Sequence, residues 1–446
     1  MATRKPNSSL AALSDLASMW KASGLKQKLI FTGVALAVFR LGAQIPIWGI
    51  NGQAIQHYAS NQLLGLLDMF SGGGLTSLSI LALGIGPYIT ASIIMQLMTV
   101  VIPRLEELQK EEGEQGRRRI SQYTRYLTVI LALVQSAMVL KVFAGTPNVL
   151  LPGVEPWLFY PSAALVLVAG SLFSLWLAES ITERGVGNGG SLLIFVGIIS
   201  RIPFYANQTS ELVSGDPQRS FSLVILLAIY LATMALIVIL QLAERKIFIV
   251  SAKRQVGNKV YGGQSTYIPF KINPAGVMPI IFAFAVLAFP QTIIQFIQQS
   301  NPTGLLMELM LFYGRYLAPG TLGYIVIEFS MIVFFTFFYA SIMPSMQPRE
   351  IAENLKKYGS SIPGIKPGKP TADKLDEILS RITLIGAIAL ACVTLVASSA
   401  TSLTGITTLQ GLGSTALIIM VGVALDTVNQ IRVHLMARHY EGFLKA

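Results

Sequence analysis

Long runs of hydrophobic residues alternate with shorter polar stretches along almost the whole chain. Most runs have about the length of a helix that crosses a bilayer, which takes roughly 17 to 25 residues. The pattern therefore predicts an all-α polytopic membrane protein with ten transmembrane helices. The expected spans are 28–48, 75–98, 122–143, 158–181, 190–206, 220–243, 275–298, 321–343, 381–400 and 412–431.

One shorter apolar piece, 63–70, comes before the second span and is too short to cross a bilayer. A glycine run follows it, and glycine is disfavoured inside a helix. A short apolar helix at membrane depth needs surrounding protein or a water-filled cavity. The pattern thus predicts a half-helix that sits in a hollow and is joined by a soft, mobile link, with one acidic side chain that favours the wet side. The residues concerned are Leu63, Leu64, Leu67, Asp68, Phe70, Gly72, Gly73 and Gly74.

Composition supports a membrane protein, and the distribution of charge gives its orientation. The 446 residues are 53% hydrophobic and 12% charged, whereas soluble domains carry about 25% charged residues. Most of the 33 lysines and arginines lie in the two tails and in the loops after even-numbered spans. The positive-inside rule then places both termini and those loops in the cytoplasm, and it explains most of the net charge of +11 without nucleic acid. The exceptions are Arg40, Lys141, Arg201, Arg219 and Arg315.

The spans divide into two groups of five around a polar external link. Because five is odd, the two halves have opposite orientations, which is the arrangement of inverted repeats. The first residues form either an amphipathic helix at the interface or a loose tail. The expected segments are 1–25 (cytoplasmic), 26–206 (N-terminal half, with 63–74 as the half-helix and its link), 207–219 (link), 220–431 (C-terminal half) and 432–446 (cytoplasmic tail).

Two cytoplasmic loops, 244–273 and 344–380, are longer than tight connections require. Both place basic residues near turn signals such as Gly257-Asn258 and Pro363-Gly364. A topology signal or contact with anionic lipid head groups is one interpretation. Topology needs few charges, so a docking surface for a partner is the interpretation that we favour.

Candidate catalytic chemistry is weak. The histidines His57, His434 and His439 lack a metal-binding spacing, and the single Cys392 excludes an intrachain disulfide. The glycine patterns at 185–190 and 364–371 match neither a dinucleotide fingerprint nor a phosphate loop. We therefore expect no enzymatic activity and no cofactor. Few ionisable residues lie within spans, which weakens the alternative of an ion-coupled secondary transporter of a small solute without excluding it.

Uncharged polar side chains lie within or beside the apolar runs. Such groups can hydrogen-bond one helix to another at about 1 kcal/mol each. Ordinary helix packing is the other interpretation. The residues are Thr90, Gln96, Asn188, Asn273 and Gln291.

Five long motifs follow one another in the sequence: DMFSGGGLTSLSILALGIGPYITASIIMQL, GEQGRRRISQYTRY, TERGVGNGGS, QSTYIPFKINPAGVMPIIF and PREIAENLKKYGSSIPGIKPGKPT. Together they resemble the SecY family of protein-translocation channels over nearly the whole chain. The resemblance implies a channel that passes unfolded secretory polypeptides across the membrane and releases transmembrane segments sideways into lipid. It also implies ten helices in two inverted halves, with 63–74 as a plug and the polar groups above at a lateral gate.

The resemblance further implies a pore ring of apolar side chains, which would keep a narrow neck dry. The matching positions are Ile85, Ile89, Ile194, Ile281 and Ile419, with Gly190 at a sixth position that is usually bulky. Simple core packing is the alternative role for each isoleucine. Residues implied in docking are Arg245, Lys246, Lys253, Arg254, Lys259, Arg349 and Lys366, and this lysine replaces the family's usual arginine.

The implied partners are the small membrane subunits SecE and SecG, the SecA motor ATPase, the ribosome, secretory and membrane protein substrates, and anionic lipids. The implied location is the inner (plasma) membrane, or a thylakoid membrane.

Overall fold

The computed structural model describes residues 23–51, 71–110, 113–144, 149–214, 217–251, 254–256, 259–261, 265–298, 304–318, 320–342, 347–406, 409 and 413–444. Most of the expected N-terminal segment 1–25 lies outside them. So do the half-helix residues Leu63, Leu64, Leu67, Asp68 and Phe70, and the docking residue Lys253.

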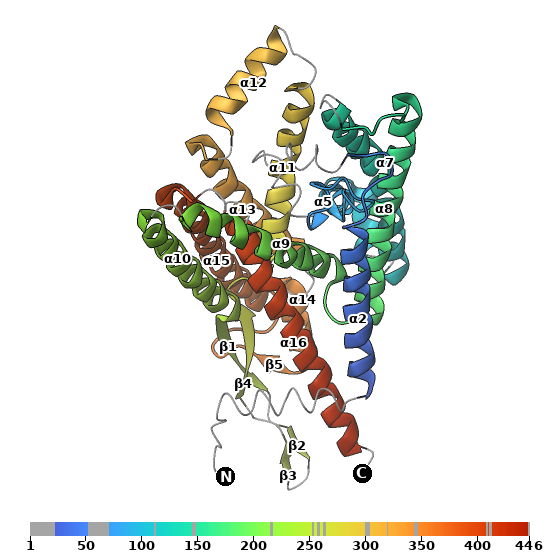
Figure 1. Ribbon diagram of the computed structural model, residues 1–446. Helices are drawn as coiled ribbons and strands as arrows, with labels where there is room; N and C mark the ends of the chain where they lie inside the picture. Colours follow the sequence, from blue (N-terminus) through green and yellow to red (C-terminus); the bar gives the residue numbers. More distant parts are fainter. Residues whose placement is uncertain are drawn as a thin grey trace. The chain divides into compact units, whose positions relative to one another are not determined.

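Each of the ten expected spans contains a helix within the described residues (Figure 1). Seven of the described helices are long and apolar enough to cross a membrane, and the bent pair α5–α6 makes an eighth candidate. These observations confirm a mainly helical, polytopic membrane protein. The long helices are α2 (Ser23–Gly42), α5 (Gly86–Val101), α7 (Gly113–Ala144), α8 (Pro156–Arg184), α9 (Gly189–Ser214), α10 (Pro217–Leu242), α11 (Met278–Gln298), α13 (Leu322–Ile342), α15 (Lys369–Thr404) and α16 (Ser414–Leu444).

Shorter elements lie between the long helices. The helices are α6 (Pro103–Lys110), α12 (Leu305–Tyr316) and α14 (Pro348–Lys357). The strands are β1 (Glu244–Ser251), β2 (Arg254–Val256), β3 (Lys259–Tyr261), β4 (Ser265–Lys271) and β5 (Ser360–Ser361). Strand β1 pairs antiparallel with both β4 and β5, and β2 pairs with β3.

The second span is shorter than we expect from its hydrophobicity. Residues 72–78 and 80–85 form turns, and helix α5 begins only at Gly86. Positive φ angles at Gly72, Gly73 and Gly84 break the helical path. Pro87 lies in the first turn of α5, where its missing N–H would have no helical partner in any case.

Two other boundaries also differ from expectation. Helix α9 continues to Ser214 and α10 starts at Pro217, so most of the expected link 207–219 is helical. Helix α11 starts at Met278 rather than 275. Asn273 lies in the turn before it and donates from Nδ2 to the carbonyl of Gly276 at 2.8 Å. That bond holds a turn where a helix start was expected.

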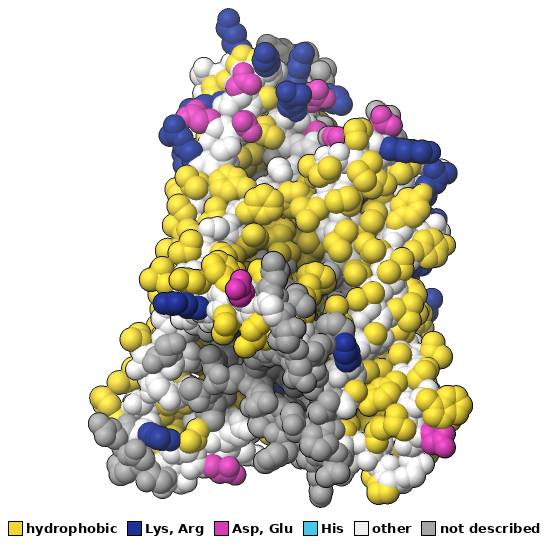
Figure 2. Space-filling view, turned by 90° about the horizontal axis from the view of Figure 1, so that it is seen from above, with side chains coloured by type: hydrophobic (Ala, Val, Ile, Leu, Met, Phe, Trp, Pro, Cys, Tyr) yellow, Lys and Arg dark blue, Asp and Glu magenta, His cyan; other side chains and the backbone are white. Residues whose placement is uncertain are grey.

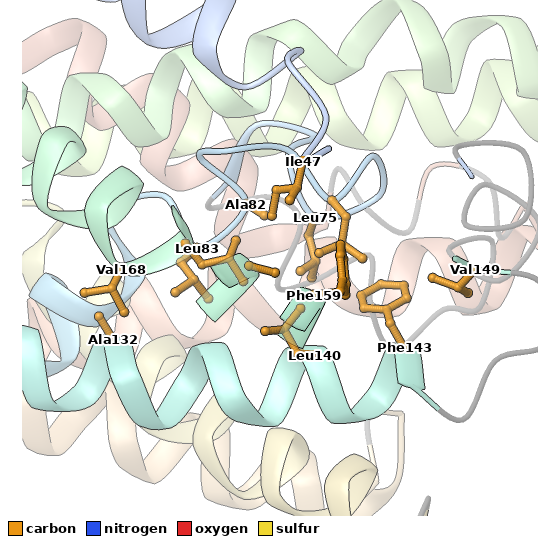
Figure 3. Close-up of a cluster of buried hydrophobic side chains, with 13 residues drawn as sticks. Ile47, Leu75, Ala82, Leu83, Ala132, Leu140, Phe143, Val149, Phe159 and Val168 are labelled. Atoms are coloured by element: carbon orange, nitrogen blue, oxygen red, sulfur yellow. The ribbon is translucent and has the colours of Figure 1, made fainter. Parts of the chain in front are cut away.

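The chain forms two compact units, and each has its own core. The first consists of Met1–Phe204, Ala288–Pro302 and Val423–Ala446. In its core, side chains from the 71–85 segment, such as Leu75 and Leu83, pack with Ala132 and Leu140 of α7 and with Phe159 of α8 (Figure 3). The non-helical segment is therefore fixed by apolar packing against two spans.

The second unit consists of Tyr205–Leu287 and Thr303–Gly422. One of its cores joins α10, α15 and the start of α16 through residues such as Leu226, Ala397 and Leu417. The other core lies under the β1–β4 hairpin, where Ile247 and Ile249 pack with residues of α14 and α15. The inverted relation of the two predicted halves stays a prediction.

Large hydrophobic side chains are exposed on many long helices, as at Val34 of α2, Leu165 of α8 and Leu231 of α10. Figure 2 shows one face on which hydrophobic side chains predominate among the described residues, with most Lys, Arg, Asp and Glu near its margins. An exposed apolar surface of this extent is what a lipid environment requires.

Candidate functional site

The five isoleucines of the predicted pore ring are all buried. In the first unit, Ile85 caps the start of α5, Ile89 follows one turn later, and Ile194 lies in the second turn of α9; their exposures are 0%, 8% and 1%. In the second unit, Ile281 in the first turn of α11 and Ile419 near the start of α16 are 3% and 0% exposed. Each therefore lies close to the start of its helix. Whether they form one ring stays a prediction.

Gly190, at the sixth ring position, lies directly beside Ile85. A Cβ added at Gly190 would stand 3.4 Å from Ile85 Cδ1 and 3.4 Å from Asn188 Oδ1, which is ordinary van der Waals contact. A side chain larger than alanine would therefore meet the end of Ile85. Within the first unit, Ile85 fills the space where a bulky residue at position 190 would point.

The start of α9 is held tightly against α8. A Cβ at Gly189 would lie 1.9 Å from the carbonyl oxygen of Ala178, so only glycine fits. The Gly189 N–H also donates to Thr182 Oγ1 at 2.9 Å. The carboxamide oxygen of Asn188 accepts from the Ser191 N–H at 3.2 Å, as an N-cap does. These contacts position Ile194 one turn further along the helix.

The loop between α8 and α9 also binds two other helices of the first unit. The Val186 N–H donates to Thr32 Oγ1 of α2 at 3.0 Å, and the Gly187 N–H donates to Gln430 Oε1 of α16 at 2.9 Å. A Cβ at Gly187 would lie 3.3 Å from Thr427 Oγ1. The glycine-rich motif thus joins four helices. Sequence reasoning missed Thr32 and Gln430, because neither stands in a recognisable motif.

The predicted lateral-gate residues make hydrogen bonds within their own segments. Three of these bonds run from Thr90 Oγ1 to the Gly86 carbonyl at 3.2 Å, from Gln96 Nε2 to Ser92 Oγ at 3.3 Å, and from Asn273 to Gly276. Asn273 Oδ1 is buried and has no hydrogen-bond partner among the described residues, and Gln291 is 4% exposed. The assignment of these residues to a gate stays a prediction.

The glycines after the predicted half-helix are packed closely. A Cβ at Gly72 would lie 2.9 Å from Gly197 Cα, and a Cβ at Gly74 would lie 2.6 Å from Ser79 Oγ. The sequence suggests that these glycines provide softness. The structure adds a second reason for them, since a side chain at either place would collide with its neighbours. The mobility of the link stays a prediction.

The two long basic loops share one sheet and one core in the second unit. Val250 and Ser251 of β1 pair with Ser361 and Ser360 of β5, so the loop after α13 completes the sheet begun by the loop after α10. In β1, Ile247 and Ile249 are buried and Phe248 is exposed between them. This alternation, typical of a half-buried strand, was the signal that sequence reasoning overlooked.

The described residues among those predicted to dock partners lie in β1, in the separate β2–β3 sheet, in α14 and in the turn before α15. Arg245, Lys246, Arg349 and Lys366 are exposed, and Lys246 Nζ lies 4.7 Å from the ring centroid of Tyr267 on β4, a cation–π contact. Arg254 and Lys259 stand in strands β2 and β3. The role of these residues in docking a partner stays a prediction.

No group of three or more His, Cys, Asp or Glu side chains suited to a metal ion occurs in the part of the chain that the structure describes. Of the ionisable residues that lie within the apolar runs, Glu328 is buried in α13, Arg40 is half-buried and Asp426 is exposed.

Comparison with known proteins identifies the class to which this fold belongs. A solved protein-conducting channel matches with a TM-score of 0.66 at 18% identity, covering 91% of this chain and 92% of that one. A SecY structure, whose plug domain is described as stabilising the closed state of the translocation channel, has a TM-score of 0.62 at 18% identity, with 92% of each chain covered. Sec61 in a canine ribosome–channel complex has a TM-score of 0.60 at 16% identity, covering 91% and 92%. The fold is that of a protein-conducting membrane channel.

Sequence comparison gives the family. The SecY family profile matches residues 79–428. The protein translocase subunit SecY of Synechocystis is 44% identical over 439 residues, covering 98% of both chains. The chain belongs to the SecY family. This result confirms the resemblance seen in the sequence, and it does not favour the alternative of an ion-coupled transporter.

Proposed function

We propose that this chain is the channel-forming subunit of a protein translocase, which conducts unfolded secretory polypeptides and releases transmembrane segments sideways into lipid. The observation that carries the proposal is family membership over nearly the full length. The burial of all five candidate ring isoleucines supports the assignment of the neck. In this proposal the chain itself makes and breaks no covalent bond during translocation, so partners supply the energy that moves the polypeptide.

The proposed neck seals by excluding water. Branched apolar side chains at Ile85, Ile89 and Ile194 of the first unit, with Ile281 and Ile419 of the second, make a constriction that water does not wet. Because these side chains offer no hydrogen bonds, they can part around any sequence and close after it. Gly190 has no side chain of its own there, so Ile85 meets no side chain from the sixth ring position.

The proposed lateral gate consists of α5 and α11. An apolar signal helix can replace the packing of these helices and shift an equilibrium between closed and open states. Thr90, Gln96, Asn188, Asn273 and Gln291 would be the polar contacts at which the gate parts. Asn273 Oδ1 is buried without a hydrogen-bond partner among the described residues, and a change of partner on gate opening would account for such a group.

The proposed plug is 63–74, which closes the channel from outside in the resting state. The proposed partners are the two small subunits SecE and SecG, the motor SecA, the ribosome and anionic lipids. The exposed cations on the sheet of the second unit support docking of the motor and of ribosomal RNA. We place both termini and this sheet in the cytoplasm, in a plasma membrane or a thylakoid membrane, on the positive-inside distribution of charge.

The test is cross-linking of a stalled secretory chain to single cysteines at Ile85, Ile281 and Ile419, in a background with Cys392→Ser. Leu165→Cys, which is 66% exposed on α8, is the matched control on a lipid-exposed surface. We expect cross-links at the three isoleucine positions and few at Leu165. Absence of cross-links at all three would exclude the proposed path. Co-purification of two small membrane proteins with the chain tests the proposed subunits.

A further inference from the structure

Two arginines that the charge pattern leaves without a role converge on the C-terminal end of the predicted plug and the turn that follows it. Arg40 lies in the last turn of α2, and Arg201 lies in the middle of α9. Arg40 Nη1 donates to the carbonyl of Gly72, and Arg201 Nη2 donates to Thr76 Oγ1. All of these residues belong to the first unit. An ionised donor makes a hydrogen bond about twice as strong as a neutral one.

Additional contacts surround residues 72–76, which we call the seat of the two arginines. Ser200 Oγ lies 3.4 Å from the same Gly72 carbonyl. A Cβ at Gly73 would lie 2.9 Å from Arg201 Nε, so the guanidinium lies directly over this glycine. Gly72 and Gly73 also have φ angles of +64° and +98°, which favour glycine. The chain at 72–73 is thus shaped to receive both arginines.

The segment is also closed on itself and packed from its other side. Ser71 Oγ accepts from the Leu75 N–H at 3.0 Å, and Thr76 Oγ1 donates to the Gly73 carbonyl at 2.9 Å. Leu75 is buried in the core formed with α7 and α8 (Figure 3). Leu78 belongs to the same core. Residues 72–76 are therefore held by three kinds of interaction: the two arginine contacts, the local turn and the apolar packing. Movement of the segment must break at least one of them.

We propose that Arg40 and Arg201 form an arginine clamp, which fixes the C-terminal end of the plug and so sets its closed position. The inference rests on the proposed function, since it treats 63–74 as a plug. The arginines are positioning residues, because they act on the plug's attachment and not on a passing chain. The arginine contacts carry a full charge, so a polar or charged passing chain can compete for them.

The test uses the full chain with its membrane partners, reconstituted in planar bilayers, with resting ion conductance measured in the absence of a secretory chain. Losing one charged hydrogen bond should raise the resting open fraction about tenfold in Arg201→Leu and in Arg40→Leu. Arg315→Leu is the control, because Arg315 lies on α12 in the second unit. Transport of a secretory protein is measured in parallel for every variant.

A double-mutant cycle separates the clamp from general damage to the fold. Thr76→Val removes the acceptor of Arg201 and keeps the side-chain shape. If the two groups act through their contact, Arg201→Leu should add little to the effect of Thr76→Val. If Arg201→Leu does not assemble, Arg201→Gln and Thr76→Val provide the same comparison.

Normal resting conductance in the arginine variants, together with intact transport, would overturn the clamp and leave the proposed function standing. Additive effects of Arg201 and Thr76 would also overturn it. Absence of transport by the unmodified complex would instead refute the proposed function and the clamp together.

Discussion

Gly170→Ala is a substitution whose effect follows directly from the packing of α8. Gly170 lies in the middle of α8, and a Cβ there would lie 2.0 Å from the carbonyl oxygen of Ile80. An ordinary carbon–oxygen contact is about 3.3 Å, so something must move by about 1.3 Å. Ile80 cannot retreat freely, because its N–H donates to the Ile45 carbonyl at 2.9 Å. The neighbouring Ile47 N–H is held by the carbonyl of Leu78 at 3.0 Å.

We expect Gly170→Ala to cost about 1–3 kcal/mol, the usual range for overpacking. In domains of 150–250 residues each kcal/mol lowers the unfolding temperature by roughly 2–4 °C. The assay is the apparent unfolding temperature in detergent at a fixed scan rate, because membrane proteins of this size often unfold irreversibly. Gly33→Ala is the matched control, since a Cβ at Gly33 of α2 meets nothing within 4 Å. Its expected effect is neutral or slightly stabilising. Equal unfolding temperatures for Gly170→Ala and the unmodified protein would refute the close contact, as would an equal loss in Gly33→Ala.

Two further predictions concern the neck and the loop that positions α9. Ile89→Asn should let water enter the neck and raise resting ion conductance at least about tenfold, the change given by ~1.4 kcal/mol. Unchanged conductance in planar bilayers would contradict the ring assignment. Ile199→Asn, on the exposed face of α9, is the control. Thr32→Val should destabilise the protein by about 1–3 kcal/mol, because it leaves the buried Val186 N–H without its acceptor. Thr32→Ser keeps the hydroxyl and should unfold near the temperature of the unmodified protein. If Thr32→Val is as stable as the unmodified protein, the bond to Val186 contributes little.

The sequence was sufficient for the approximate positions of the apolar helices among the described residues, because hydrophobic runs of membrane length have few alternatives. It was insufficient for 75–85, where the residues are as apolar as those of the helix that follows but form turns instead of a helix. Hydrophobicity reports burial and not backbone path, and the glycines at 72–74 and 84 were the only local warning. In the loop after α10, attention to charge hid the strand alternation of Ile247 and Ile249.

Some features of the candidate site could be predicted from the sequence, and others could not. Burial of Ile85, Ile89 and Ile194 could be expected from their place in apolar helices. The contacts of Arg40 with Gly72 and of Arg201 with Thr76 could not, because they join residues 32 and 125 positions apart. Only the tertiary fold brings them together. The departure of both arginines from the topological charge pattern was nevertheless a usable signal that each had another task.

The pairing of β1 with β5 has a mechanical consequence. Strand β1 begins two residues after α10 ends, and the chain after β5 turns at 363–368 into the 36-residue helix α15. A pull on the β1–β4 hairpin is therefore shared between two helix roots, through the backbone bonds of one sheet and the apolar core beneath it. A force that a partner applies to only one of the two loops is therefore transmitted to both α10 and α15, because the two loops share one sheet.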